Sequence, residues 1–204
     1  MTLRYEDVLD NLRAWYDGEA PDRDGMVKQQ FKLDERAAFL DRLRVTEASS
    51  LLEIGAGTGQ DSVYFRDAGL DVIAVDLSPE MVRRCREKGV EALVGDAKRL
   101  EFPAGSFDAV WAMNCLLHMP GADLPEALRE VRRVLRPGGL FYVGQWGGAH
   151  DEGIRAQDQR FFAHRSDEQL FAAVREAFEV VDFHALEDEG HHFQSITAVR
   201  PLSP

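Results

Sequence analysis

The stretch Glu53-Ile54-Gly55-Ala56-Gly57-Thr58-Gly59 constrains the fold of this chain more than any other feature. An apolar run from Ser50 enters it, and a helical pattern leaves it at Gln60. Glycine adopts left-handed backbone angles freely and lets a ligand approach the main chain closely. Asp76 ends the next apolar run, where a carboxylate at a strand tip can hold two ribose hydroxyls. The pattern predicts a nucleoside pocket at the edge of an open α/β sheet.

The spacing of the glycines separates two kinds of nucleoside-binding turn. The pattern here is GxGxG, whereas dinucleotide-binding proteins carry GxGxxG. The third glycine, Gly59, comes one residue too early for that second pattern. We therefore expect a nucleoside other than a nicotinamide dinucleotide, and an oxidoreductase is a less favoured alternative.

Length and composition exclude few classes of protein. The 204 residues suit one domain with a full core, and the hydrophobic content of 45% and charged content of 29% are ordinary for a globular protein. The net charge of −12 argues against a nucleic-acid partner, because such binding depends on basic side chains that neutralise phosphates. A small-molecule ligand is the simpler expectation, and the oligomeric state is left open.

Several other kinds of site are not expected. Cys85 and Cys115 lie in apolar patterns and read as buried thiols rather than a disulfide. The adjacent His191 and His192 have no nearby metal-ligand spacing, so we expect no metal. Apolar runs stay well short of the roughly 20 residues that span a bilayer, and the first residues, MTLRYEDVLD, are too acidic for a signal peptide. The expectation is a cytoplasmic protein with no membrane partner.

From residue 50 onward, strand patterns alternate with helix patterns. Strands are expected at residues 50–54, 71–76, 91–94, 107–113, 140–146, 178–185 and 193–199, and helices at 60–68, 79–88 and 124–135 and after the capping box at 166–169. This alternation predicts a parallel sheet covered on both faces, a three-layer α/β sandwich. Because parallel neighbours need a long crossover, the short turn near residues 187–190 predicts a hairpin with one antiparallel strand.

The first 45 residues have a different pattern. Val8, Leu12 and Tyr16 belong to a helical stripe, residues 27–43 read as a second helix, and the polar stretch 17–25 between them contains Gly and Pro. We interpret residues 1–45 as a helical cover on the ligand edge of the sheet. The cover and the sheet-forming part, residues 46–204, are expected to form the same domain.

Five motifs in this order resemble the class I S-adenosylmethionine-dependent methyltransferases. LLEIGAGTG is similar to the first motif of the family and VDLSPEMV to the second, and GDA at residues 95–97 is similar to the turn that contacts adenine. FDAVWAMNCLLHMP resembles the fourth motif, and LRPGG resembles the start of strand five. The resemblance implies a Rossmann-like sheet of seven strands in the order 3-2-1-4-5-7-6, with strand seven antiparallel.

The resemblance also implies a cofactor, S-adenosyl-L-methionine, which leaves as S-adenosyl-L-homocysteine, and a set of residues that contact it. Asp76 would accept hydrogen bonds from the ribose hydroxyls, and Asp96 and the Ala97 N–H would read the adenine. Glu53 would support the turn or reach the cofactor ammonium through water. The remaining expected contacts are Gly55, Ala56, Gly57, Gly59, Leu77, Met81, Asn114 and Tyr16.

Methyl transfer from S-adenosylmethionine requires few catalytic groups from the protein. Orientation alone can supply about 7–11 kcal/mol, and a general base is needed only if the acceptor must lose a proton. His118, just after strand four, and His150, beyond strand five, are the candidate bases, each with a structural role as the alternative. The expected pocket for a small-molecule methyl acceptor consists of Trp15, Gln30, Gln145, Trp146 and Arg160.

Two alternatives stand beside direct in-line methyl transfer to a small molecule. The first is a protein that binds S-adenosylmethionine without catalysis, because displacement chemistry leaves no obligatory catalytic residue in the sequence. The second is the nicotinamide-dependent oxidoreductase, which the third glycine and LRPGG both disfavour.

Overall fold

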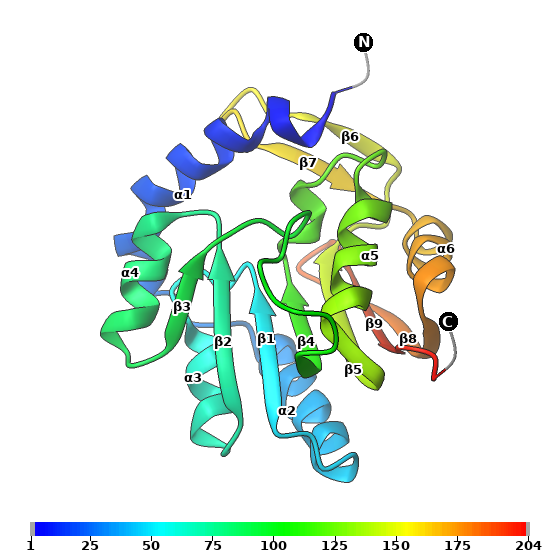
Figure 1. Cartoon of the computed structure of the whole chain (residues 1–204). Helices are drawn as coiled ribbons and strands as arrows, with labels where there is room; N and C mark the ends of the chain where they lie inside the picture. The colour runs from blue at the N-terminus through cyan, green and yellow to red at the C-terminus, as the bar shows by residue number, and fades with distance from the viewer. Residues whose placement is uncertain (1–2, 203–204) are drawn as a thin grey trace.

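A seven-stranded sheet forms the centre of the computed structural model, which describes residues 3–202 (Figure 1). Its order is β3-β2-β1-β4-β5-β9-β8, which confirms the predicted order because β9 and β8 are the predicted seventh and sixth strands. Only β9 runs antiparallel to its neighbours, β5 and β8. The bounds are β1 Ser50–Ile54, β2 Asp71–Asp76, β3 Glu91–Val94, β4 Phe107–Met113, β5 Leu135–Trp146, β8 Glu179–Asp188 and β9 His191–Val199.

The parallel pairing brings the ends of neighbouring strands together. Ile54, the last residue of β1, pairs with Val75, next to the end of β2. Met113 at the end of β4 pairs with Gly144 of β5. The glycine turn after β1, the carboxylate at the end of β2 and the loop after β4 therefore meet at one edge of the sheet, as expected for ligand sites in open α/β sheets.

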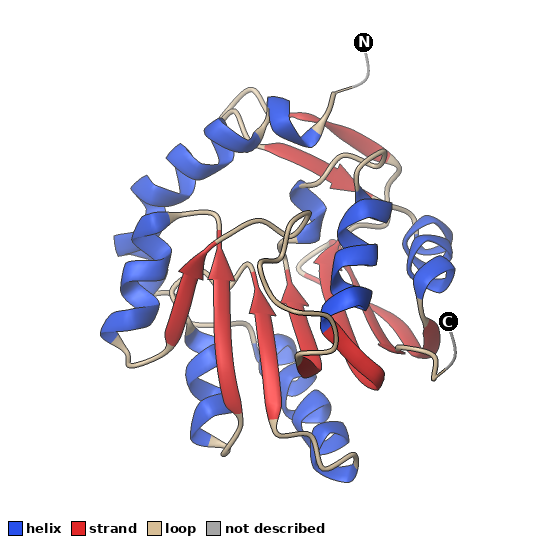
Figure 2. Ribbon diagram, viewed as in Figure 1, coloured by secondary structure: helices blue, strands red, loops and turns tan. Residues whose placement is uncertain are grey.

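Helices cover both faces of the sheet (Figures 1 and 2). On one face, α5 (Leu124–Val134) and α6 (Asp167–Ala177) pack on Phe141 and Val143 of β5. On the other face, α2 (Gln30–Val45) and α3 (Gln60–Asp67) pack on Leu51 and Trp111, and α4 (Pro79–Glu87) packs on Ala74. The predicted three-layer α/β arrangement is confirmed.

The N-terminal helices differ from their predicted positions. α1 (Leu9–Asp24) continues through most of the polar stretch 17–25, which we expected to separate the two helices, with Pro21 inside it. Contacts with α4 outweigh the low helix propensity of Gly and Pro there. In Figure 1, α1 (dark blue) arches over the carboxyl edge of the sheet, whereas α2 packs on a face. The cover on the ligand edge is therefore α1 rather than both helices.

Other boundaries differ as well, and β5 begins at Leu135 rather than at residue 140. α5 ends at Val134 rather than Leu135, because Leu135 is already extended (φ −70°, ψ 147°) two residues before Pro137, which cannot continue a helix. The hairpin between β8 and β9 is longer than predicted, so that its turn is Glu189–Gly190.

A small hairpin follows β5 and was not predicted. It consists of β6 (Asp151–Ile154) and β7 (Phe161–His164), which pair antiparallel and lie near α1 (Figure 1). The buried Arg165 guanidinium after β7 donates to the carbonyl oxygens of Leu116 (3.2 Å) and Met119 (2.6 Å). These bonds fix the 3-10 helix η2 (Leu116–His118), which follows β4.

Both cysteines are free thiols, as predicted, with Cys85 buried and Cys115 partly buried. Within residues 3–202, every helix is too short or too polar to cross a bilayer.

Candidate functional site

A cavity of about 250 Å³ opens at the carboxyl edge of the sheet, beneath α1. Its wall combines α1, the loop between α1 and α2, the glycine turn, the end of β2 and the loop after β4. Of the predicted site residues, it is lined by Tyr16, Glu53, Gly55, Ala56, Gly57, Asp76, Leu77, Met81, Ala97, Asn114 and His118.

The three glycines of the turn all have left-handed backbone angles, but for different reasons. A Cβ on Gly55 (φ +69°) would lie 2.2 Å from Cys115 Cβ, and one on Gly59 (φ +81°) would lie 2.9 Å from Cys85 Sγ. Gly57 (φ +55°) has nothing within 4 Å of that position and lines the cavity. Gly55 and Gly59 thus permit close packing, and Gly57 exposes bare backbone to open space. Gly59 does not line the cavity.

Asp76 ties the end of β2 to the glycine turn. Its Oδ2 accepts from the Gly57 N–H at 2.8 Å, and its Oδ1 accepts from the Ser78 N–H at 2.9 Å. Ser78 itself caps α4 by accepting from the Met81 N–H, as the sequence indicates. Desolvation in the cavity wall raises the pKa of Asp76 to about 6, although the two backbone donors oppose this shift.

A second group of charges lies under the turn, and sequence reasoning missed most of it. The buried Asp61 carboxylate forms ion pairs with Lys28 and with Arg36 (2.9 Å). Glu53 is also buried and accepts from the Ser62 hydroxyl, and burial together with the Asp61 charge raises the pKa of Glu53. An acid in the first turn of α3 was the available signal for Asp61, whereas nothing local indicates Lys28.

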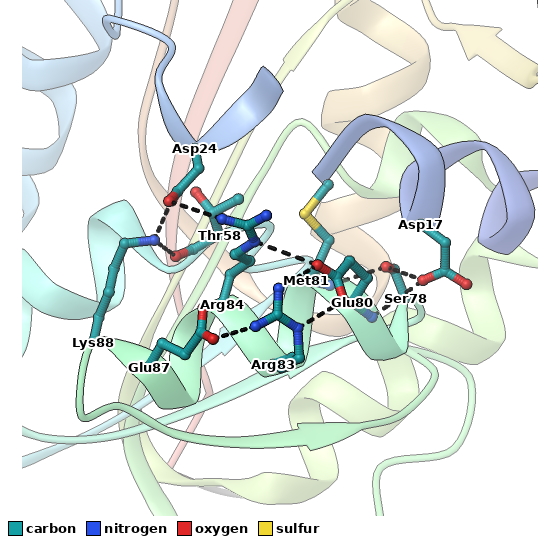
Figure 3. A network of polar contacts seen from close by, with 10 residues as sticks. All are labelled: Asp17, Asp24, Thr58, Ser78, Glu80, Met81, Arg83, Arg84, Glu87 and Lys88. Atoms are coloured by element: carbon teal, nitrogen blue, oxygen red, sulfur yellow. Dashed lines mark hydrogen bonds and ion pairs between the residues drawn. The ribbon is translucent and has the colours of Figure 1, made fainter. Parts of the chain in front are cut away.

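α1 is held on the rim of the cavity by polar contacts with α4 (Figure 3). Asp17 Oδ1 accepts from the Ser78 hydroxyl (2.5 Å) and from the Glu80 N–H (3.1 Å) at the N-terminus of α4. Near the other end of α4, Asp24 pairs with Lys88, whose ammonium also donates to the Thr58 carbonyl at 2.6 Å. The cover is thus joined to both the helix after β2 and the glycine turn.

Asn114 follows β4 directly and lies in the left-handed region, with φ +54°. Its N–H donates to the Gly144 carbonyl at 2.7 Å, which continues the β4–β5 pairing. Its side-chain Oδ1 is buried in the cavity wall and has no hydrogen-bond partner among residues 3–202. Buried polar atoms are nearly always paired, so this oxygen indicates a ligand.

At the opposite end of the cavity, Gly95 and Ala97 contribute to the wall, but Asp96 does not. Asp96 Oδ1 accepts from the Lys98 N–H at 2.8 Å. Partial burial raises the pKa of the Asp96 carboxyl.

The side chains of His118 and Tyr16, which both line the cavity, contact each other. Tyr16 Oη lies 2.6 Å from His118 Nε2, and His118 Nδ1 lies 2.8 Å from the Phe161 carbonyl oxygen. Burial lowers the pKa of His118 to about 4, so the ring is neutral at physiological pH.

The remaining predicted residues lie outside the cavity wall. Arg160 stacks on Trp15, with its guanidinium carbon 3.6 Å from the ring centre. Gln145 is completely buried, and neither side-chain polar atom has a partner among the described residues. The others are surface or rim contacts: exposed Gln30 with Asp34, Trp146 with Phe31 and Phe193, and His150 with Gln169.

No three His, Cys, Asp or Glu side chains within residues 3–202 are arranged to hold a metal ion. The cavity wall combines the backbone of the glycine turn, carboxylates, the Tyr16–His118 pair, Asn114 and the basic side chains of Arg23, Lys28 and Lys32.

Comparison with known proteins agrees with this geometry. Residues 52–143 match the family model of a methyltransferase domain. The chain contains a class I S-adenosylmethionine-dependent methyltransferase domain. The match agrees with S-adenosyl-L-methionine, the cofactor that the motifs implied.

Relatives of the methyltransferase domain include methyltransferases that are named after a small molecule. The chain is 34% identical over 112 residues (52% of its length and 35% of the relative) to 2-methyl-6-phytyl-1,4-hydroquinone methyltransferase of Synechocystis sp.. It is 31% identical over 157 residues (70% and 55%) to 27-O-demethylrifamycin SV methyltransferase of Amycolatopsis mediterranei. The chain thus spans about a third to a half of the length of these two relatives.

A solved structure covers nearly the whole chain. It is the 1,6-didemethyltoxoflavin-N1-methyltransferase of Burkholderia thailandensis with bound 1,6-didemethyltoxoflavin and S-adenosylhomocysteine, with a TM-score of 0.77 over 98% of this chain and 92% of that one. The sequence identity is 23%, so this likeness shows that the methyltransferase fold extends over the N-terminal cover.

Proposed function

We propose that this protein transfers a methyl group from S-adenosylmethionine to a small-molecule acceptor by direct in-line displacement. The observation that carries the proposal is one cavity lined by the bare Gly57 backbone, the Asp76 carboxylate and Asn114, whose buried Oδ1 has no partner among residues 3–202. Each provides what the cofactor needs: close approach to the backbone, acceptors for ribose hydroxyls and a partner for a polar group.

Different residues of the cavity wall would contact different parts of the cofactor. Asp76 would accept from the ribose hydroxyls, because a carboxylate forms strong, charge-assisted hydrogen bonds. The Ala97 N–H would pair with the adenine ring, with Asp96 ordering that turn or reading the exocyclic amine. Gly55, Ala56 and Gly57 would contact the methionine part, and Leu77 and Met81 would pack on the ribose and adenine.

When bound, S-adenosylmethionine supplies an electrophilic methyl group on a positively charged sulfur. The protein's own contribution is to orient the acceptor and exclude water, and positioning of this kind can supply most of the acceleration. α1 closes the cavity from above, and η2 and the loop after β4 form its side. None of these roles requires a metal.

A small molecule is the favoured acceptor class. The relatives named above carry small-molecule names, and the net charge of −12 disfavours a nucleic-acid substrate. Trp15, Gln30, Gln145, Trp146 and Arg160 do not line the cavity, and we propose that they shape the acceptor side from behind its wall.

Two assays test the proposal. Incubation with a tritiated methyl donor and a broad metabolite panel should label at least one acceptor.

The Asp76→Ala variant should bind S-adenosylhomocysteine about 30-fold more weakly, as expected when a charge-assisted partner is lost. The control is Asp71→Ala, an exposed aspartate at the far end of the same strand, which should leave binding unchanged. Binding without any labelled acceptor would favour a non-catalytic binding protein, and equal binding by both variants would remove Asp76 from the site.

A further inference from the structure

The Tyr16–His118 contact allows its protons to be placed from the partners around it. His118 Nδ1 lies 2.8 Å from the carbonyl oxygen of Phe161, which can only accept a hydrogen bond. Nδ1 must therefore carry the hydrogen. The neutral imidazole then has a bare lone pair on Nε2, 2.6 Å from Tyr16 Oη. The Tyr16 hydroxyl must donate to it.

This direction of donation decides what Tyr16 offers to the cavity. Its one hydrogen is directed at His118, so its oxygen presents only lone pairs to a ligand. Arg160 Nη1 donates to the same oxygen at 3.4 Å and leaves it one lone pair, and Arg160 Nη2 donates to Asp158 Oδ2 at 2.6 Å. Trp15 supports that guanidinium from one side. The phenol is thus held in place as a hydrogen-bond acceptor in the cavity wall.

This direction of donation disfavours one form of the expected Tyr16 contact with the cofactor, a hydrogen bond to the methionine carboxylate. A carboxylate needs a donor, and the only donor hydrogen of Tyr16 is engaged by His118. A ligand group that meets this oxygen favourably has to bring its own hydrogen.

We propose that Tyr16 Oη accepts a hydrogen bond from the nucleophilic O–H or weakly basic N–H of the methyl acceptor, and that Tyr16 and His118 carry this proton away. The inference rests on the proposed function and extends it to a substrate class: acceptors whose nucleophile bears a hydrogen. Tyr16 is then a catalytic residue, and His118, which acts through it, is a positioning residue and proton carrier.

Protons and electrons balance in this step. The acceptor atom forms a bond to the methyl carbon, and the electron pair of the broken carbon–sulfur bond stays on sulfur. The acceptor's proton moves to Tyr16 Oη while the Tyr16 proton moves to His118 Nε2. A hydroxyl oxygen that has just gained a methyl group is strongly acidic, so a weak base suffices, and burial lowers the pKa of His118 to about 4. The imidazolium then releases its proton to water.

The hydrogen placement is tested first, by nitrogen NMR of the full chain with labelled histidine at neutral pH. The His118 signals, assigned with His118→Asn, should show a protonated Nδ1 and a bare Nε2. Tyr16→Phe should shift the Nε2 signal, and Tyr64→Phe, which removes a phenol outside the cavity wall, should not. A protonated Nε2 or a charged ring would overturn the proposal, and this measurement needs no cofactor.

The second test measures whether the cavity binds a ligand with a hydrogen-bond donor more tightly than a similar ligand without one. Phenol and anisole share a ring and differ in the hydrogen that Tyr16 would accept. With S-adenosylhomocysteine bound, phenol should bind about fivefold more tightly than anisole, and Tyr16→Phe should abolish the preference while Tyr64→Phe keeps it. Equal binding of the two probes, no phenol binding, or a preference that survives Tyr16→Phe would overturn the inference. If S-adenosylhomocysteine itself fails to bind, the proposed function is what fails.

Discussion

At the scale of single residues, the site depends on a contact between two segments that the sequence places 19 positions apart. The Gly57 N–H donates to Asp76, and this bond connects the turn after β1 to the end of β2. Both residue types were identified from the sequence, because a glycine turn followed by a carboxylate at the next strand tip is typical of a nucleoside pocket. The contacts of Lys28 and Asp61 were not identified, since no local pattern connects α3 with the loop before α2.

Two glycine variants should separate the packing and binding roles of the turn. Gly55→Ala would force its Cβ into Cys115 and should lower the free energy of unfolding by about 3 kcal/mol or more. Gly57→Ala meets no atom and should cost only about 1 kcal/mol for its left-handed angle, yet weaken cofactor binding by filling the cavity. Chemical denaturation and calorimetric titration measure the two effects. A stable Gly55→Ala variant would contradict this division.

The pKa of Asp76 predicts the pH dependence of cofactor binding. Ribose hydroxyls are best accepted by the ionised carboxylate, which predominates above a pKa of about 6. If the bound state requires that form, affinity for S-adenosylhomocysteine should be about tenfold lower at pH 5 than at pH 7. His118 and Lys32 also face the cavity, but their pKa values of about 4 and about 8 lie outside this range.

Calorimetric titrations at pH 5, 6 and 7 measure this dependence. The Asp76→Asn variant is the control, because it keeps the shape of the side chain and cannot ionise. It should bind weakly at every pH. A wild-type affinity that is the same at pH 5 and pH 7 would show that another group holds the ribose.

At the scale of elements, the sheet was predictable and its cover was only partly so. β1 and β2 are short apolar runs ended by turn residues, and their bounds agree with the sequence prediction. The helix through Pro21 was not predictable, because it depends on Asp17 and Asp24 reaching α4. The β6–β7 hairpin has no alternating apolar pattern, and Arg165 ties it to η2 through backbone carbonyls.

The contact of Asp17 with the N-terminus of α4 predicts a role for α1 in retaining the cofactor. Asp17→Ala removes the acceptor for the Ser78 hydroxyl and the Glu80 N–H and should destabilise α1 by about 1–2 kcal/mol. Hydrogen exchange in α1 should become faster, and S-adenosylhomocysteine should dissociate faster. Asp10→Ala, at an exposed position of the same helix, should change neither. Unchanged exchange in the Asp17 variant would contradict this role of the contact.

At the scale of the whole molecule, the cavity residues that the sheet supplies were predicted better than those that the N-terminal cover and the loops after β5 supply. Gly57, Asp76 and Ala97 lie at strand ends, where the order of the strands fixes their positions. Trp146 and Arg160 lie at or beyond the end of β5, where loops and the second hairpin decide which side chains reach the cavity. A motif specifies the first kind of position, and only tertiary packing specifies the second.

The central claim, that the glycine turn and Asp76 together bind an adenosyl sulfur compound, is tested most directly by calorimetric titration of the full chain. S-adenosylmethionine and S-adenosylhomocysteine should both bind with one site per chain, and NAD should give no heat of binding. Binding of NAD without binding of the two sulfur compounds would contradict the account.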